Sequence, residues 1–203
     1  MTPPERSPER DAAIAAMLPH VPFDGWTYRA VRRGLASIGA PPEDAPLLFP
    51  GGSGDMIEAF CDWADRRMEQ AAASLDPALP LHQRVRAAIA LRLEQNRPHK
   101  EAIRRALAHL AVPGNTRLAA AVTARTVDAI WHAAGDRSAD FSWYTKRAIL
   151  AVIWAATLFY WLRDIGEDDA ATLAFLDRRL AGVGRIGSMR RRAEAAIGRL
   201  RPV

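Results

Sequence analysis

The sequence has 203 residues, of which 49% are hydrophobic and 25% charged, and its 28 Lys and Arg against 23 Asp and Glu give a formal net charge of +5. This length allows one well-buried core but not two comfortable domains, and the composition excludes disorder over most of the chain. The single cysteine, Cys61, excludes an internal disulfide and fits a reducing compartment.

The first part of the chain predicts two short helices and a turn region. Residues 1–10 hold acids and prolines where a signal peptide would hold an apolar core, and we expect a disordered leader there. A first helix is predicted over residues 11–18, ended by the proline that follows, and a second over residues 27–39, with Thr27 as its N-cap. Residues 40–54 are rich in Pro and Gly and predict turns.

Longer helices are predicted in the middle of the chain. Apolar residues recur every three or four positions in segments that begin near Asp55, Leu81, Pro98 and Leu118. No segment sustains the period-two alternation that is typical of a half-buried strand. The sequence therefore predicts an all-α chain of about nine or ten helices.

Charge is segregated along the chain. Lys and Arg are absent from residues 34–65, which contain six acidic residues. Residues 178–203 show the opposite composition, with eight arginines against the single acid Glu194. A basic surface for a partner, if the protein has one, is therefore predicted near the C-terminus.

Residues 148–162 form the most apolar segment, with no charge between Arg147 and Arg163. A membrane-spanning helix needs about 20 apolar residues, so we predict a helix that is buried in protein. Because its apolar residues lie all round, it is either a central core helix or a helix with one side in the core and the other against a second subunit or a lipid. The side predicted for lipid consists of Ile149, Val152, Ile153, Ala156 and Tyr160.

Residues 183–203 predict a basic amphipathic helix, because apolar residues recur every three or four positions while arginines fill much of the remaining face. Such a helix at a chain end is typical of binding to an anionic membrane surface. The alternative is a solvated helix that packs on its own domain. The residues predicted to contact the membrane are Ile186, Met189, Arg190, Arg191, Ile197 and Leu200.

Sequence motifs for catalysis or metal binding are missing. The five histidines are scattered singly, without a Cys or His partner at metal-ligand spacing. The glycines of residues 50–54 lack the preceding strand and the following Lys-Ser/Thr of a phosphate-binding loop. We therefore predict no catalytic residue, no metal site and no cofactor.

Several separated motifs resemble the Coq-nine family of ubiquinone-biosynthesis proteins over about residues 11–188. These motifs are PHVPFDGWT at residues 19–27, LFPGG at 48–52, RTVD at 125–128 with AGD at 134–136, and, most specifically, DFSWYTKR at 140–147. Two positions depart from the family's pattern: Ser142 stands where an Asn is usual, and Trp154 where we expect a Tyr.

The resemblance implies a single domain over residues 11–182 with a fold like that of the TetR transcriptional regulators. Residues 11–70 would form a degenerate helix-turn-helix part, and residues 71–182 a part that binds lipid and forms a homodimer. Family members are not enzymes; they bind isoprenoid quinone lipids and present them to the diiron hydroxylase that acts late in the pathway. The resemblance thus places the protein at the inner membrane of a bacterium, on the cytoplasmic side, or on the matrix side in a mitochondrion.

By similarity, the hydroxylase would dock on Asp140, Trp143, Tyr144 and Arg147, a mixture of large aromatic and cationic side chains that is typical of binding hot spots. The alternative is that Trp143 and Tyr144 only cap the start of the apolar helix. Residues 47–60 resemble the region of a regulator's recognition helix, yet contain no Lys or Arg to meet phosphates. We therefore expect no nucleic-acid binding. A lipid-sensing transcriptional regulator is the alternative function, and an unrecognised enzyme is a third.

Overall fold

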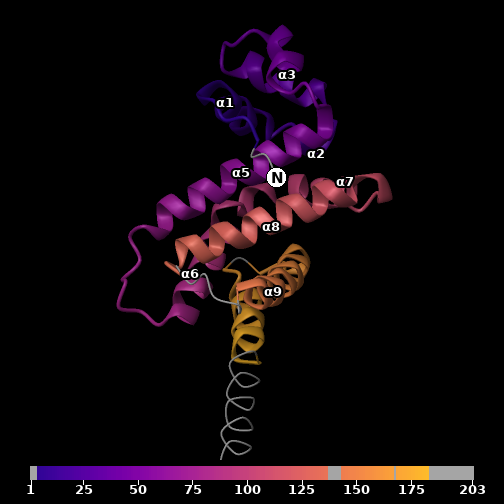
Figure 1. Ribbon diagram of the computed structural model, residues 1–203. Coiled ribbons are helices and arrows are strands. Elements are labelled where there is room, and N and C mark those ends of the chain that lie inside the picture. The colour runs from indigo at the N-terminus through magenta and orange to yellow at the C-terminus, as the bar shows by residue number, and fades with distance from the viewer. Residues whose placement is uncertain (1–3, 137–142, 167, 183–203) are drawn as a thin grey trace, which may run out of the picture. The chain divides into compact units, whose positions relative to one another are not determined.

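The computed structural model describes residues 4–136, 143–166 and 168–182 (Figure 1). These ranges are largely helical and contain no strand, as the all-α prediction requires. The chain forms two compact units, Met1–Ala151 and Val152–Val203. Some predicted site residues lie outside the described ranges, namely Asp140, Ile186, Met189, Arg190, Arg191, Ile197 and Leu200.

The first unit opens with helix α1, Pro8–Met17. The Ser7 side chain accepts a hydrogen bond from the backbone N–H of Arg10 at 3.2 Å, and a proline occupies the first helical position. This Ser-Pro start is a favourable N-terminus, because the capping oxygen satisfies a free N–H and the proline has none to satisfy. The predicted disordered leader of residues 1–10 is therefore too long: its last three residues are helical.

Two further short helices, α2 (Val21–Asp24) and α3 (Tyr28–Ser37), follow α1. Helix α3 packs closely on α1 at Gly34, where a Cβ atom would lie only 2.7 Å from the backbone of Ala16. Thr27 stands at the N-cap of α3 as predicted, but its hydroxyl donates to the carbonyl of Asp24 instead of capping the helix.

Residues 40–54 are more regular than the predicted turn region. A 3-10 turn, η1 (Pro42–Asp44), leads into the single-turn helix α4 (Ala45–Leu48), and α5 (Gly52–Ala72) begins three residues before Asp55. Phe49 is fully buried below α4, while Leu47 is 79% exposed. Burial of this one aromatic residue explains why a segment rich in Pro and Gly has a defined structure.

Helix α5 is the centre of the first unit. It packs against α1, α6 and α8, and Figure 1 shows it running alongside α8. Buried side chains on α5, among them Met56, Ile57 and Met68, meet Ile89 of α6 and Ile130 of α8 in the core. The remaining elements of this part are α6 (Leu81–Gln95), η2 (Arg97–His99), α7 (Lys100–Leu110), η3 (Pro113–Asn115) and α8 (Thr116–Ala133).

The apolar segment lies in α9, Trp143–Arg163, which crosses the boundary between the two units. By length and composition alone, its 19-residue stretch Thr145–Arg163, which includes the charge-free segment and flanking cations, could cross a membrane, with 33% of the most apolar window buried. Core helices of soluble proteins pass the same test. The second unit continues with a helix over residues 170–182. The ring of Phe175 in this helix stacks on the ring of Tyr160 in α9, with centroids 4.6 Å apart.

Candidate functional site

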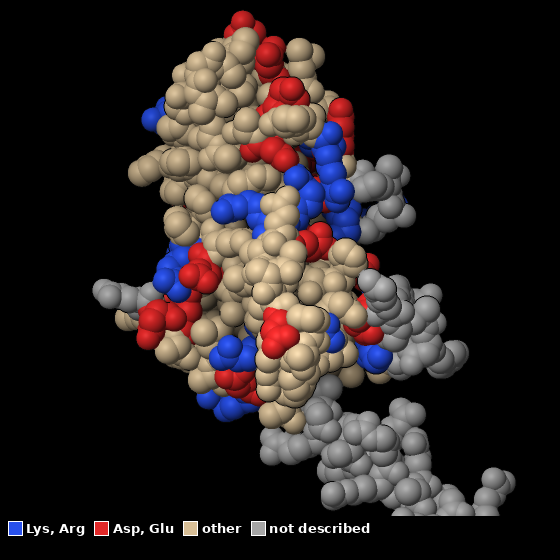
Figure 2. Space-filling view, turned by 90° about the vertical axis from the view of Figure 1, so that its left-hand side faces the viewer, with Lys and Arg blue, Asp and Glu red and all other residues tan. Residues whose placement is uncertain are grey.

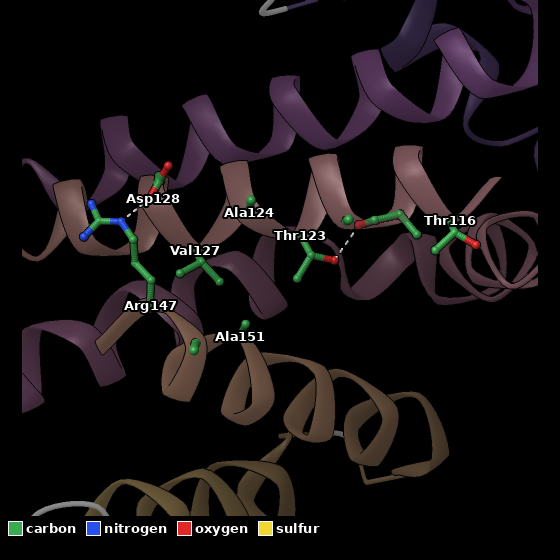
Figure 3. Close-up of a pocket in the computed structure, with 10 residues that line it drawn as sticks. Thr116, Thr123, Ala124, Val127, Asp128, Arg147 and Ala151 are labelled. Atoms are coloured by element: carbon green, nitrogen blue, oxygen red, sulfur yellow. Dashed lines mark hydrogen bonds and ion pairs between the residues drawn. The ribbon is translucent and has the colours of Figure 1, made fainter. Parts of the chain in front are cut away.

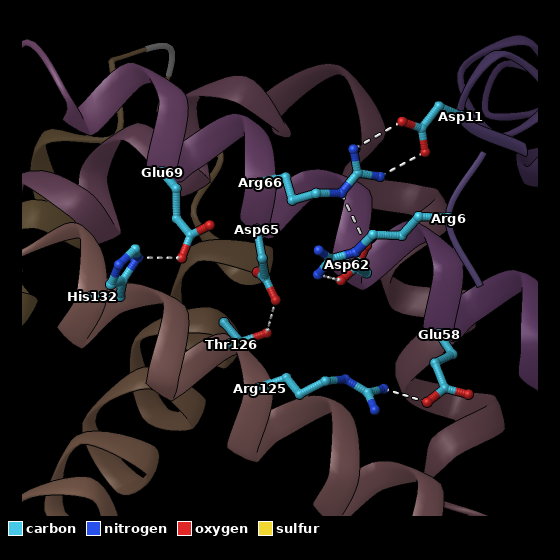
Figure 4. A network of polar contacts seen from close by, with 10 residues as sticks. All are labelled: Arg6, Asp11, Glu58, Asp62, Asp65, Arg66, Glu69, Arg125, Thr126 and His132. Atoms are coloured by element: carbon cyan, nitrogen blue, oxygen red, sulfur yellow. Dashed lines mark hydrogen bonds and ion pairs between the residues drawn. The ribbon is translucent and has the colours of Figure 1, made fainter. Parts of the chain in front are cut away.

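The acidic residues of α5 form a row of ion-paired side chains (Figure 4). They recur at intervals of three and four residues, which places them on one side of a helix. Their partners come from α1 and the segment before it, from α5 itself, from α6 and from α8. The pairs are Asp55 with Arg10, Glu58 with Arg125, Asp62 with Arg6 and Arg66, Asp65 with Arg92, and Glu69 with His132.

The most buried of these pairs is Asp65 with Arg92. The Arg92 Nε donates to Asp65 Oδ1 at 2.9 Å, and the Thr126 hydroxyl donates to Asp65 Oδ2 at 2.8 Å. All three side chains are buried. Burial raises the pKa of the Asp65 carboxyl, although Arg92 and Thr126 oppose the shift. A buried ion pair of this kind is a structural element, since burial keeps both side chains out of reach of a substrate.

These contacts explain the absence of cations from residues 34–65. Most acids on α5 receive their cations from other parts of the chain, so the sequence segment is acidic while the folded surface is mixed. On the face drawn in Figure 2, positive and negative side chains lie next to each other in the middle, whereas the charged side chains near the upper end are mainly acidic. The three- and four-residue spacing of the acids is the sequence signal that could have predicted this row.

The N-terminal helices are tied to the rest of the first unit by polar contacts. The buried Arg10 guanidinium donates to the carbonyl of Leu48 and to Asp55. The Trp26 Nε1 donates to the carbonyl of Ala102 in α7 at 2.9 Å, and its ring packs on Phe60 with centroids 5.3 Å apart. These contacts hold the N-terminal helices, α1 through α4, against α5 and α7.

A groove of about 550 Å³ lies between α8 and the start of α9, within the first unit (Figure 3). This volume falls in the range of ligand pockets, roughly 300–1,000 Å³. The sequence analysis did not identify the groove. Its walls are mostly small apolar side chains: the lining residues are Thr116, Ala119, Ala120, Thr123, Ala124, Val127, Asp128, Arg147, Ala148 and Ala151.

One end of the groove carries an ion pair between α8 and α9, and a second ion pair joins α9 to the residues that follow α8. The Arg147 Nε donates to Asp128 Oδ1 (Figure 3). Lys146 Nζ lies 3.8 Å from Asp136 Oδ2. Gly135, with φ of 72°, ends α8 in the left-handed conformation, so that the chain turns and Asp136 can reach Lys146. The RTVD and AGD motifs therefore hold the first turns of α9 against α8.

The structure brings together only part of the predicted docking surface. Arg147 lies at the groove, and Trp143 and Tyr144 lie in the first turn of α9, where their backbone is helical. Asp140 lies outside the described residues. Arg147 is thus the one predicted docking residue whose side-chain contacts the structure describes.

The predicted lipid side of α9 does not line the groove, which uses Arg147, Ala148 and Ala151 instead. Val152 is 69% exposed, and Ile149 and Tyr160 are also exposed, whereas Ile153 is buried and Ala156 is half-buried. Phe159 adds a further exposed aromatic ring to α9. The helix therefore presents apolar side chains to its surroundings as well as to the core.

The described residues contain no group of three or more His, Cys, Asp or Glu that could hold a metal ion. Cys61 has no thiolate character, because burial and the nearby Asp65 carboxylate raise the pKa of its thiol to about 12. We therefore interpret Cys61 as a structural residue, not a reactive one.

Comparison with known sequences gives consistent similarities. The COQ9 family model matches residues 116–187. The mitochondrial ubiquinone biosynthesis protein COQ9 of Rattus norvegicus is 34% identical over 175 residues, covering 82% of this chain and 56% of the rat protein. The human protein is also 34% identical over 175 residues, with 82% and 55% covered. The Schizosaccharomyces pombe protein is 32% identical over 177 residues, with 85% and 69% covered.

The chain spans about half the length of the mammalian relatives. Among solved structures, a TetR transcriptional regulator from Nitrosomonas europaea superposes with a TM-score of 0.69 and 23% identity, covering 86% of this chain and 97% of the regulator. At this identity the likeness concerns the fold alone, and it confirms the predicted TetR-like architecture.

Proposed function

Because this chain belongs to the COQ9 family of ubiquinone biosynthesis proteins, we propose that it is a non-catalytic accessory protein that binds isoprenoid quinone intermediates and presents them to the diiron hydroxylase of the pathway. The observation that carries this proposal is the apolar surface around α9, which combines exposed large side chains with a groove of ligand size. The predicted lipid contacts are Ile149, Val152, Ile153, Ala156 and Tyr160.

Copurified lipid tests the proposal directly. We expect organic extraction of the protein from a ubiquinone-producing host, followed by mass spectrometry, to recover an isoprenoid quinone or precursor in near-stoichiometric amount. The control is an unrelated helical protein purified identically. Recovery of phospholipids alone would count against lipid presentation.

The hydroxylase is proposed to dock at the start of α9, on Asp140, Trp143, Tyr144 and Arg147. Large aromatic and arginine side chains dominate binding energy at protein interfaces. We expect Trp143→Ala and Arg147→Glu to abolish capture of the hydroxylase. Matched controls are Phe23→Ala, which removes an aromatic ring that is 81% exposed, and Arg32→Glu on the exposed face of α3. Equal capture by all four variants would disprove this docking site.

The basic C-terminal segment is proposed to hold the protein at an anionic membrane surface, on the cytoplasmic side of a bacterial inner membrane or on the matrix side of a mitochondrial one. The relatives named above are mitochondrial proteins. The proposed contacts are Ile186, Met189, Arg190, Arg191, Ile197 and Leu200. We expect Arg190→Glu with Arg191→Glu to abolish flotation with phosphatidylglycerol vesicles; unchanged flotation would remove these arginines from the membrane contact.

A homodimer is proposed to form through α9, whose exposed apolar side chains are of the kind that subunit interfaces bury. Light scattering after size-exclusion chromatography should give twice the chain mass. A monomer that still binds lipid would assign the whole exposed face to lipid.

A TetR-type regulator is the second candidate function, favoured by the fold. The geometry of α4 argues against it: a helix of one turn, preceded by Glu43 and Asp44, offers neither the length nor the cations of a recognition helix. The contacts of Arg10 and Trp26 also fix this part to α5 and α7. A gel shift at low salt with the protein's own upstream DNA should show no sequence-dependent complex.

A further inference from the structure

The groove between α8 and α9 is shaped mainly by one face of α8. Seven of its ten lining residues come from α8, between Thr116 and Asp128, and recur every three or four positions. They cover about three helical turns, roughly 18 Å along the helix axis. Helix α9 contributes only Arg147, Ala148 and Ala151, all near its start. The groove is therefore elongated along α8 and bounded by α9 at the Asp128 end.

The middle of the groove offers few polar groups to a ligand. Five of its lining residues are alanines. The two threonine hydroxyls are used within the fold: Thr123 donates to the carbonyl of Ala119 at 2.8 Å, and Thr116 to that of Pro113 at 2.7 Å. Because both hydroxyls already donate within the fold and the other residues here are alanines and a valine, the groove presents mainly methyl groups to its occupant along most of its length.

The end of the groove at Asp128 is polar, in contrast to its apolar middle. The side chain of Asp128 is 52% exposed and that of Arg147 is 22% exposed, so their ion pair remains accessible at the rim. A carboxylate accepts hydrogen bonds and a guanidinium donates up to five. A molecule with an oxygenated ring at one end and a thin apolar tail fits a groove that is polar at one end and apolar along the rest. A purely apolar molecule would make no hydrogen bond with the ion pair.

We propose that this groove is the binding site for the head of the lipid: the first isoprene units lie along the alanines of α8, and the oxygenated ring lies beside Asp128, where its oxygens accept hydrogen bonds from Arg147. This inference rests on the proposed function and locates it in the fold. The ring is then held one helical turn from Trp143, at the proposed docking surface. The exposed side of α9 around Val152 is left for the membrane or a second copy.

Filling the groove tests the site. The full-length protein is titrated with ubiquinone carrying two isoprene units, by isothermal calorimetry. We expect Ala124→Leu to weaken binding by at least about tenfold, because the larger side chain occupies the tail path. The matched control is Ala108→Leu, the same change at an exposed alanine on α7 outside the groove, which should bind as the unchanged protein does.

The polar end has its own test. Arg147→Gln should weaken binding of the ubiquinone probe by about tenfold, because the quinone oxygens only accept hydrogen bonds and Arg147 is the donor at this end of the groove. Binding of 2,6-dimethyl-2,6-octadiene, a hydrocarbon with the same tail and no ring, should be unaffected. Equal loss for both probes would show that Arg147 only supports the fold, and would overturn its assignment to the ring.

The outcomes separate the two proposals. If the unchanged protein binds neither probe, the proposed function fails. If it binds the quinone and Ala124→Leu binds equally well, the groove is not the site and the inference is overturned, while lipid binding stands. If Val152→Asp abolishes quinone binding and Ala124→Leu does not, the site is the side of α9 predicted from the sequence. A change of oligomeric mass in Ala124→Leu with unchanged binding would assign the groove to a protein helix.

Discussion

Helices α5 and α9 have the same length, 21 residues, and opposite chemistry. Helix α5 carries a row of acids, nearly all of them paired with an arginine, and buries apolar residues such as Met56 and Ile57 completely. Helix α9 has an uncharged middle, and several of its large apolar side chains are exposed, Val152 and Phe159 most of all.

The difference indicates where each kind of residue is used. On α5 the carboxylates form ion pairs within the protein, so they stabilise the fold and are not available to a ligand. On α9 the apolar groups exceed what the described fold buries, so they are available to a lipid or a partner. Polarity along the sequence is therefore a poor guide to function here: the charged helix is the structural one.

The largest expected effect comes from one substitution made on both helices. Ile57→Asp places a carboxylate at a fully buried position of α5 and should prevent folding, because an unpaired buried charge costs more than about 4 kcal/mol. Val152→Asp makes a comparable change at an exposed position of α9 and should alter stability by less than about 0.5 kcal/mol.

Circular dichroism during thermal unfolding measures both variants. Val152→Asp serves as the control for protein production as well as for stability. Strong destabilisation by Val152→Asp would mean that the exposed side of α9 is packed within the functional assembly, and the contrast between the two helices would then be one of assembly state.

The next effect concerns the buried pair on α5. Asp65→Ala leaves Arg92 as a buried charge without its partner and should destabilise the protein by about 3–5 kcal/mol. The double variant Asp65→Leu with Arg92→Met removes both charges and should recover most of this loss. Denaturant unfolding gives both values. A single variant as stable as the unchanged protein would show that water or another group compensates Arg92.

The sequence allowed prediction of the longer helices, because apolar spacing of three and four residues survives in α5, α6, α7 and α8. It failed at residues 40–54, where Pro and Gly suggest turns but burial of Phe49 organises η1 and α4. It also placed the start of α1 three residues late, although Ser7 and Pro8 form a recognisable helix start. Tertiary burial and cap chemistry outweighed composition in these two places.

The candidate site was predictable only in part. Arg147 and the first turn of α9 were identified through a motif, whereas the groove beside them was missed. Its residues are mainly alanines and threonines of α8, which carry no chemical signal in a sequence. A groove arises from what the side chains leave empty and from how two helices meet, and neither quantity is encoded in the spacing of residues on one helix.

A smaller effect is expected where the row of pairs on α5 approaches the surface. The side chains of Glu58 and Arg125 are 26% and 19% exposed, so solvent screens their attraction. Glu58→Gln should cost about 0.5–1 kcal/mol in low salt, and less in 1 M salt, where the Debye length falls to about 3 Å. Denaturant titrations at the two salt concentrations measure the difference. A loss that is independent of salt would indicate that packing, not charge, holds this side chain.

The smallest effect is expected at His99, near the end of α6 and close to Arg67 of α5. Burial and the Arg67 charge lower the pKa of His99 below its ordinary value of 6.5. The unfolded chain therefore takes up this proton more readily than the folded one, so the contribution of His99 to stability is present above pH 6.5 and is lost as pH falls through its folded pKa. His99→Gln should flatten the stability profile on the acid side of pH 6.5. If the variant keeps the slope of the unchanged protein, other groups carry the acid sensitivity, and the charge of Arg67 has no destabilising effect on its neighbour.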